Sequence, residues 1–284
     1  MKCDWNAYIK ILPPSVKQLV TPYRESLNET RLRLHSCTEL VTAKGSIRLT
    51  HKCTPQDLSF TINVASKYSP WSAATLKEGY ITAPGGHRIG ICGDTVVKDG
   101  YMTGISTPTS VSIRIAKDFP GIAAKIKTMG DSVLIIGPPG TGKTTLLRDL
   151  IRQKSALCSG CIAVVDERRE IFPYENGLPC FLCGDNTDIL VGCPKKQGIP
   201  NLIKNMTPRW IAVDEITSEE DCKALTDARW CGVNVICTAH AKDKSDLYAR
   251  EIYKPLIDNH IFDWLITMQP DRSWKAERIT LCLK

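Results

Sequence analysis

The pattern of hydrophobic and polar positions divides the chain into two regions. Before residue 117, short apolar runs alternate with turn signals, as in SIRL, YITAPGGHRIGICGD and VSIRIAK. In VSIRIAK every second residue from Val111 to Ile115 is apolar, which predicts a strand with one buried face. Pro84-Gly85-Gly86 predicts a turn between two strands, and a helix is expected around 16–20. Residues 1–117 are therefore predicted to form a small α+β N-terminal domain without a catalytic constellation of its own.

The region 118–284 has a different pattern, in which longer apolar runs alternate with helical segments. The runs VLII, CIAVV, WIAV and VNVICT lack polar alternation, and helical spacing is found in TTLLRDLIRQ, in 198–206 and in SEEDCKALTDAR. Strands that are apolar on both faces and alternate with helices indicate a mainly parallel sheet covered by helices. The segment KDFPG at 117–121 is the expected linker. We therefore expect an α/β core in 118–284.

A glycine-rich loop follows the first of these strands. Residues 137–144 read GPPGTGKT, which fits the phosphate-loop pattern G-x-x-x-x-G-K-[ST] in full. Such glycines let successive N–H groups point at phosphate oxygens, and the helix that begins there favours the same anion. Lys143 is expected to reach the β- and γ-phosphates, and the Thr144 hydroxyl to bind Mg²⁺. The predicted nucleotide-binding residues are Gly137, Pro138, Pro139, Gly140, Thr141, Gly142, Lys143, Thr144 and Thr145. The strand before the loop and the apolar helix after it predict a RecA-like P-loop NTPase core that uses ATP and Mg²⁺.

The run WIAVDEI supplies a pair of carboxylates at the end of another buried strand. Asp214 would lie beside Mg²⁺, and Glu215 would lie nearer the γ-phosphate as the base that activates water. This pair favours hydrolysis over transfer to a substrate hydroxyl. The alternative is that Asp214 only caps the helix that follows.

Two further strand ends carry polar residues that are expected at the same edge, because parallel strands end together. After CIAVVD come Glu167 and Glu170, one of which would support the attacking water, and either Glu167 or Glu215 could be the base. After VNVICTA comes His240, which would sense the γ-phosphate. The alternatives are a solvated charged loop and a structural histidine.

The composition of the chain bears on its binding partners and on its cellular compartment. The net charge is +7 with scattered basic residues, so contact with nucleic acid or an anionic membrane is permitted but not required. Thirteen cysteines, an odd number, favour reduced thiols or a metal site in a cytoplasmic protein. The chain holds no uninterrupted apolar run of membrane-spanning length, and its first residues lack the pattern of an export signal.

The four elements in this order resemble the ATPases of type II and type IV secretion and of pilus motors. GPPGTGKTTLLRDLIRQ, VVDERREI, CPKKQGIPNLIKNMTPRWIAVDEI and TAH resemble the stage III sporulation protein AA family of endospore-forming bacteria, as do GYITAPGGHRIGICGD and SIRIAK. The resemblance implies a cytoplasmic ATPase of the mother cell, peripheral at the membrane. It also implies a hexameric ring that acts with membrane proteins of the stage III sporulation channel, without a requirement for nucleic acid.

The chain departs from the family pattern at two positions. Asn186 stands where the family usually has an arginine, and Thr217 stands where it tends to have glycine. If the arginine contacts a neighbouring nucleotide, hydrolysis would be slow in this chain. Other candidates for reaching a phosphate across a subunit boundary are Arg88, Arg114, Arg168 and Arg169.

Several alternatives stay open on sequence grounds. Cys158-x-x-Cys161 and Cys180-x-x-Cys183 have the spacing of a zinc site, but the two pairs are expected at opposite edges of the sheet. A nucleic-acid-dependent ATPase would need a stacking platform, and Tyr68, Trp71 and Tyr80 are dispersed. A non-catalytic ATP-binding scaffold fits the departure at Asn186. A small-molecule kinase is disfavoured because 243–259 is short for a substrate lid.

Overall fold

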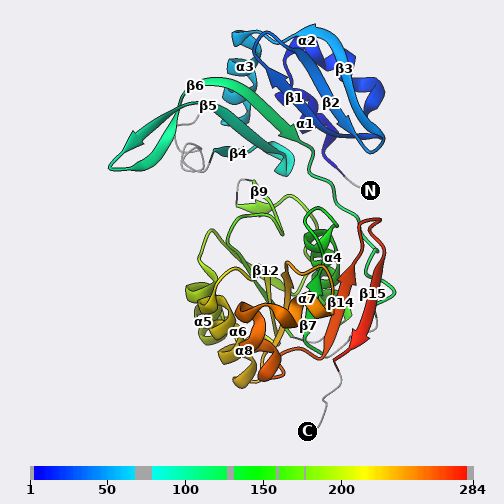
Figure 1. Cartoon of the computed structure of the whole chain (residues 1–284), viewed down its shortest axis with the longest axis vertical. Helices are drawn as coiled ribbons and strands as arrows, with labels where there is room; N and C mark the ends of the chain where they lie inside the picture. Colours follow the sequence, from blue (N-terminus) through cyan, green and yellow to red (C-terminus); the bar gives the residue numbers. More distant parts are fainter. Residues whose placement is uncertain (1–2, 68–78, 127–130, 158–159, 176, 280–284) are drawn as a thin grey trace. The chain divides into compact units, whose positions relative to one another are not determined.

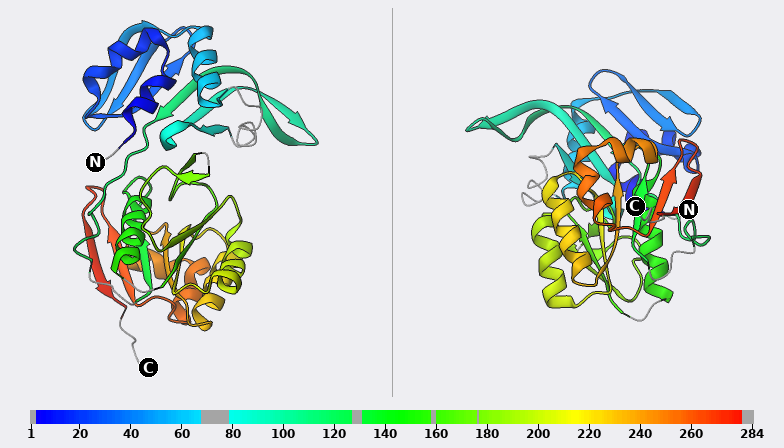
Figure 2. Two further views of the ribbon diagram at one scale, coloured as in Figure 1. Left: turned by 180° about the vertical axis from the view of Figure 1, so that it is seen from behind. Right: turned by 60° about the horizontal axis from the view of Figure 1, so that its bottom comes forward.

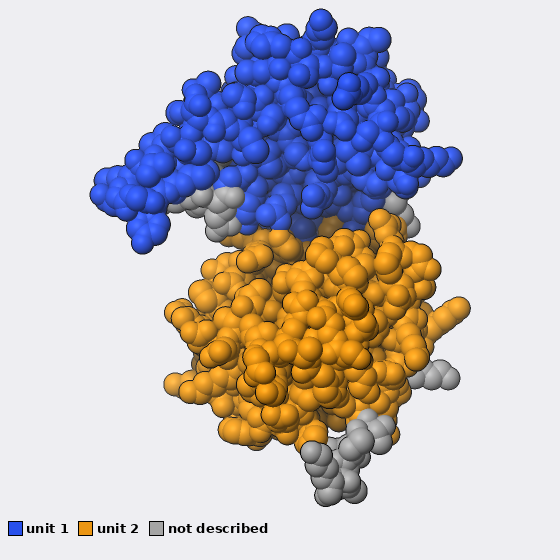
Figure 3. Space-filling model, viewed as in Figure 1, with its two compact units in different colours: residues 1–118, 173–180 blue, residues 119–172, 181–284 orange. Residues whose placement is uncertain are grey.

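The computed structural model describes residues 3–67, 79–126, 131–157, 160–175 and 177–279, which form two compact units (Figures 1 and 3). Unit 1 comprises 1–118 and 173–180, and unit 2 comprises 119–172 and 181–284. The chain therefore leaves unit 1 after Asp118, inside the expected linker. It then returns to unit 1 for the segment 173–180, an excursion that the division at residue 117 did not include.

Over its described residues, unit 1 contains an antiparallel sheet and three α-helices. The strands pair in the order β3-β2-β1-β6-β5-β4. Their bounds are β1 Leu27–Arg33, β2 Cys37–Thr42, β3 Gly45–Lys52, β4 Tyr80–Thr82, β5 Arg88–Lys98 and β6 Tyr101–Arg114. The helices are α1 Trp5–Ile11, α2 Pro14–Val20 and α3 Pro55–Ala65, with the 3-10 turns η1 Thr21–Tyr23 and η4 Pro84–Gly86. These bounds confirm the predicted turn at 84–86 and the helix around 16–20.

Alternation decides which residues of this sheet are buried. Val111 and Ile113 are at most 2% exposed, whereas Arg114 is exposed, as the period of two predicts. Together with Leu32, Leu40 and Ile89 they pack in one apolar core with the helices. Strands β5 and β6 continue past the rest of the sheet as a long two-stranded arm (Figure 1).

The excursion 173–180 is held in unit 1 by specific contacts. It contains the short strands β9 (Tyr174–Glu175) and β10 (Leu178–Pro179), which pair with each other. The Glu175 carboxylate accepts hydrogen bonds from Lys67 Nζ and from the Gly85 N–H, both at 2.9 Å. Gly86 has a φ of +78°, and a Cβ there would lie 2.7 Å from Pro173 Cβ, so only glycine fits this approach.

Unit 2 contains a seven-stranded sheet in the order β11-β8-β12-β13-β7-β14-β15. Every neighbouring pair is parallel except β14 with β15. The bounds are β7 Val133–Ile136, β8 Ile162–Asp166, β11 Thr187–Val191, β12 Trp210–Glu215, β13 Asn234–Ala239, β14 Trp264–Met268 and β15 Trp274–Arg278. The expectation of an α/β core is confirmed, and the four predicted strands β7, β8, β12 and β13 are present. The apolar runs did not reveal β11, β14 and β15.

Helices cover the two faces of this sheet. They are α4 Lys143–Leu157, α5 Lys195–Met206, α6 Glu219–Trp230, α7 Lys244–Ala249 and α8 Lys254–Asp258, with the 3-10 turn η5 Glu251–Tyr253. Helices α5, α6 and α8 lie together on one face, and α4 lies on the other (Figures 1 and 2). Residues of α5, α6 and α8 share one core with the strand residues that face them. In the part of the chain that the structure describes, no helix has the length and apolar character needed to cross a membrane.

Gly198 of α5 allows the helix to approach β8 closely. A Cβ at Gly198 would lie 2.8 Å from Val165 Cγ1 and 3.3 Å from Leu190 Cδ2. Overpacking costs about 1–3 kcal/mol, whereas alanine gains up to about 1 kcal/mol in helix propensity. We therefore expect Gly198→Ala to lower the free energy of unfolding by about 1–2 kcal/mol in a urea titration. Gly104→Ala is the control, since a Cβ there meets no atom within 4 Å, and a gain in stability for Gly198→Ala would contradict the packing.

Candidate active site

The predicted phosphate loop connects β7 to α4. Gly140 and Gly142 have φ of +78° and +97°, in the left-handed region that glycine adopts without strain. At Gly137 a Cβ would lie 2.8 Å from Met268 Cβ, so the loop starts hard against β14. The Leu146 N–H donates to the Gly142 carbonyl at 2.9 Å and begins the helical ladder. The loop therefore has the backbone that a phosphate cradle needs, at the N-terminus of a 15-residue helix.

Lys143, His240 and Glu215 form a continuous chain of hydrogen bonds. Lys143 Nζ donates to the carbonyls of Gly137 and Pro138 at 2.8 and 3.1 Å, and to His240 Nδ1 at 3.0 Å. Because an ammonium only donates, Nδ1 accepts, and the ring proton lies on Nε2. Nε2 then donates to Glu215 Oε2 at 3.1 Å. Burial lowers the pKa of Lys143, and the nearby Glu215 and Asp214 partly oppose this effect.

Asp214 lies between two hydroxyl groups. Its Oδ1 accepts from Thr144 Oγ1 at 3.2 Å and from Thr238 Oγ1 at 3.4 Å. The pairing of β12 with β13 slips by one residue between Val213 and Glu215. This irregularity places an extra residue in β12, and both Asp214 and Glu215 line one pocket although regular strand alternation would separate them. The alternative that Asp214 caps α6 is wrong, because Ser218 is the N-cap.

The oxygen atoms around Asp214 fit the requirements of a magnesium ion. Mg²⁺ prefers one or two protein oxygen ligands and completes its shell with water and phosphate oxygens. The Asp214 carboxylate and the Thr144 hydroxyl supply such ligands side by side. Thr238 adds a second hydroxyl next to Asp214. In the sequence it comes directly after the apolar run VNVIC. The donor set therefore fits Mg²⁺, which would supply charge neutralisation at phosphate oxygens.

The charged loop after β8 is shaped by Asp166. This side chain is fully buried, and its carboxylate accepts from the N–H groups of Glu170 and Phe172 at 2.9 and 2.8 Å. Arg169, directly before Glu170, has a φ of +57°. Asp166 thus closes a tight turn, and the turn directs the next residues of the loop toward the sheet edge. Arg168 and Arg169 of this loop are exposed and Glu167 and Glu170 are half-buried, so the interpretation as a solvated charged loop holds in part.

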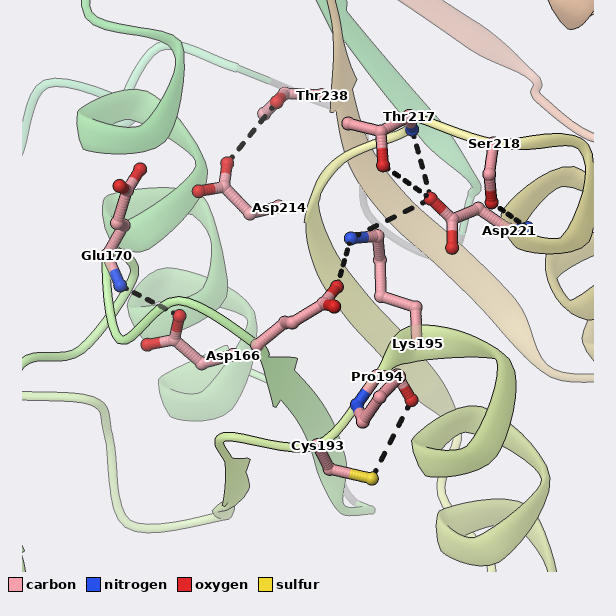
Figure 4. A network of polar contacts seen from close by, with 11 residues as sticks. Asp166, Glu170, Cys193, Pro194, Lys195, Asp214, Thr217, Ser218, Asp221 and Thr238 are labelled. Atoms are coloured by element: carbon pink, nitrogen blue, oxygen red, sulfur yellow. Dashed lines mark hydrogen bonds and ion pairs between the residues drawn. The ribbon is translucent and has the colours of Figure 1, made fainter. Parts of the chain in front are cut away.

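The structure brings the predicted carboxylates together in one pocket of unit 2, and Figure 4 labels two of them, Glu170 and Asp214. The pocket is lined by Val165, Glu167, Arg168, Glu170, Lys195, Asp214 and Glu215. Strand ends β8 and β12 supply most of these residues, as the parallel sheet predicts. Lys195 was not among the predicted site residues. It begins α5 in the segment CPKK, and no local pattern distinguishes it from its neighbour Lys196.

Burial and like charges shift the acid groups of this pocket. Burial raises the pKa of Asp214 to about 6, with further upward effects from Glu170, Asp166 and Glu215, against the Thr144 hydroxyl. Burial also raises the pKa of Asp166, opposed by the backbone N–H groups that it accepts. The surroundings of the pocket therefore disfavour the ionised forms of Asp166 and Asp214.

Asp214→Asn is expected to stabilise the nucleotide-free protein at neutral pH. A carboxyl whose pKa is near 6 when folded and 3.8 when unfolded holds its proton more tightly in the folded state. The ionised form then costs about 3 kcal/mol at pH 7.5 but only about 1 kcal/mol at pH 4.5. Urea unfolding at both pH values measures the gain, which should shrink on acidification. The control is the exposed Asp227→Asn, and an equal gain at both pH values would contradict the burial argument.

Some predicted residues lie elsewhere. Asn186 hydrogen-bonds Ser155 at the end of α4, through its N–H at 2.9 Å and its side chain at 3.0 Å. Its carbonyl accepts from the N–H of Ile162, which starts β8, so Asn186 lies at the edge of the sheet opposite the pocket. Of the four arginines considered, Arg168 lines the pocket, and Arg88 and Arg114 lie in unit 1 as a cross-strand pair.

The placement of the cysteines needs a correction. Cys183 was expected on the nucleotide side, but its carbonyl accepts from Thr187 Oγ1, next to the start of β11. It therefore lies at the same sheet edge as Cys161, because the chain crosses the sheet before β11. Cys158, like Tyr68 and Trp71, lies outside the described residues. Among the residues that are described, no three His, Cys, Asp or Glu side chains are grouped for a metal ion.

Comparison with known proteins agrees with the resemblance. The sequence model of a family described as "Sporulation stage III, protein AA" matches residues 6–277. The Stage III sporulation protein AA of Bacillus subtilis (strain 168) is 36% identical over 272 residues, which cover 91% of this chain and 89% of that protein.

Two solved structures share the fold. The ATPase DotB of Legionella pneumophila has a TM-score of 0.59 at 15% identity and covers 93% of this chain and 79% of its own. The pilus retraction motor PilT with bound ADP has a TM-score of 0.61 at 14% identity, and the match covers 89% of this chain and 77% of PilT. Sequence model and relative together show that the chain belongs to the sporulation stage III protein AA family.

Proposed function

We propose that the chain is a Mg²⁺-dependent ATPase that works as a secretion-type motor in endospore formation. One observation carries the proposal. A phosphate loop with a buried lysine lies beside a pocket that holds Glu167, Glu170, Asp214 and Glu215. A site for phosphate, an oxygen site for Mg²⁺ and carboxylates for water are the parts that nucleotide hydrolysis requires.

In the proposed mechanism the phosphate loop and the residues next to it bind the nucleotide. Lys143 exchanges its hydrogen bonds to the carbonyls of Gly137 and Pro138 for contacts with the β- and γ-phosphates. The negative charge of the phosphates offsets the desolvation cost of the buried ammonium. Thr144 and Asp214 would hold Mg²⁺, which would supply positive charge at the phosphate oxygens. The N–H groups of 137–145 bind the remaining phosphate oxygens.

Glu215 is the proposed base, and His240 connects it to Lys143. When Lys143 moves to the phosphates, His240 Nδ1 loses its donor while Nε2 still holds Glu215. The histidine thus registers whether a γ-phosphate has taken the lysine. Glu167 and Glu170 support the attacking water from the β8 side of the pocket.

The biological setting is proposed from the relatives. The Bacillus subtilis relative carries the name of a stage III sporulation protein, and PilT is a pilus retraction motor. We infer a hexameric ring that associates peripherally with the mother-cell membrane and powers or assembles a channel to the forespore through stage III membrane proteins. Nucleic acid is not required in this proposal.

The test is phosphate release by the purified chain supplied with ATP, with Mg²⁺ or with EDTA, together with its mass in solution with and without ATP. Turnover that EDTA abolishes and a mass that rises to a ring on ATP addition support the motor. Tight ATP binding by a monomer without turnover would replace it with a scaffold. Turnover that single-stranded DNA increases in a salt-dependent way would favour a nucleic-acid-dependent ATPase instead.

A further inference from the structure

Lys195 is a buried cation in an unusual position. It is the first residue of α5, and its side chain is only 7% exposed. A helix N-terminus disfavours positive charge, and lysine is rarely buried unless it is paired. The local sequence therefore does not explain why this ammonium lies inside the protein while Lys196 is exposed.

Two carboxylates from other elements account for its burial (Figure 4). Lys195 Nζ lies 2.6 Å from Glu167 Oε2 and 3.7 Å from Asp221 Oδ2. Asp221 is fixed independently, because its Oδ2 also accepts from the Thr217 N–H at 3.0 Å and from Thr217 Oγ1 at 3.1 Å. Asp221 thus anchors Lys195 at the first turn of α6, and Lys195 in turn reaches the loop after β8.

Glu167 depends on Lys195 for its place. Its side chain is 37% exposed, and among the described residues Lys195 is the partner that pairs with it. The same pocket holds Glu170, Asp214 and Glu215, whose negative charges repel a fourth carboxylate. Without a buried cation, Glu167 would turn toward solvent, where its charge is hydrated.

We propose that Lys195 is a positioning residue that holds the Glu167 carboxylate in the pocket beside Asp214 and Glu215. The inference rests on the proposed ATPase function and deepens it, because it gives the loop after β8 a fixed attachment to α5 and α6. Among the described residues, the ion pairs of Lys195 are with Glu167 and Asp221, so it orients Glu167 and leaves ATP binding to 137–145.

The test compares steady-state ATP hydrolysis by Lys195→Met, Lys195→Arg, Glu167→Gln and the double variant Lys195→Met/Glu167→Gln. We expect Lys195→Met to lower kcat about 10- to 100-fold, with KM for ATP within about threefold of wild type. Lys195→Arg should restore most of kcat because it keeps the ion pair. The double variant should be no slower than the slower single variant, since both act through one carboxylate.

Lys196→Met is the matched control, because this neighbouring lysine is exposed, and its kcat should equal that of wild type. If Lys195→Met does not fold, Lys195→Gln carries the same comparison. If the wild type hydrolyses ATP and the Lys195 variants have the same kcat, the inference about Lys195 is overturned while the proposed function stands. A double variant that multiplies the two losses would also overturn it, because Lys195 would then act independently of Glu167. Absence of turnover in the wild type would overturn the proposed function and this inference with it.

Discussion

Lys143→Ala is expected to abolish ATP turnover, with a fall in kcat/KM of about 1,000-fold. Lys143 Nζ is the ammonium at the mouth of the loop, within 3.1 Å of the Gly137 and Pro138 carbonyls. Without it, neither the ground-state phosphates nor the charge that develops on them is neutralised. The fold should persist, because burial already lowers the pKa of Lys143 and its removal relieves a desolvated charge.

The measurement is phosphate release together with binding of a fluorescent ATP analogue. Lys196→Ala is the control for loss of a lysine, since Lys196 is exposed. Thermal unfolding of Lys143→Ala without nucleotide should occur at or above the wild-type temperature. Turnover within a few-fold of wild type would rule out the phosphate role of the loop.

Glu215→Gln is expected to lower kcat by about 100- to 10,000-fold while ATP still binds. Glutamine keeps the size and the hydrogen bond to His240 Nε2, but it cannot accept a proton from water. Glu167→Gln should cost less, because Glu167 is held by Lys195 and supports the water from the β8 side. The comparison isolates proton transfer, since both changes remove one negative charge from the same pocket.

Single-turnover hydrolysis and ATP affinity should be measured for both variants. Glu170→Gln is a further comparison within the same pocket. If Glu167→Gln loses more turnover than Glu215→Gln with ATP bound, the base belongs to the loop after β8. Loss of ATP binding in Glu215→Gln would instead indicate that its ion pair with His240 maintains the phosphate loop.

The phosphate loop and the convergence of strand ends could be read from the sequence. Gly140 and Gly142 are required by left-handed backbone angles, and the apolar runs before and after the loop encode a strand and a helix locally. Once four runs indicated parallel strands, Glu167, Glu215 and His240 had to lie at one edge. The sequence by itself therefore determined the sheet edge at which the candidate site lies.

Contacts between side chains of elements that are distant in the sequence were determined only by the tertiary structure. The slip in β12 brings Asp214 and Glu215 into one pocket, although strict alternation predicts opposite faces. Lys195 and Lys196 are equivalent in sequence, and only the approach of Glu167 and Asp221 buries the first of them. The return of 173–180 to unit 1 likewise depends on Gly85 and Lys67, far away in the chain.

The physical reason for this division is the range of the forces involved. Backbone angles and hydrophobic periodicity act over a few residues, so they define elements and the order in which strand ends meet. Ion pairs, register and burial depend on which elements lie side by side, and packing fixes that arrangement only when the whole sheet forms. The sequence determined that a phosphate loop and carboxylates share one edge, and the tertiary structure determined that Lys195 pairs with Glu167 there.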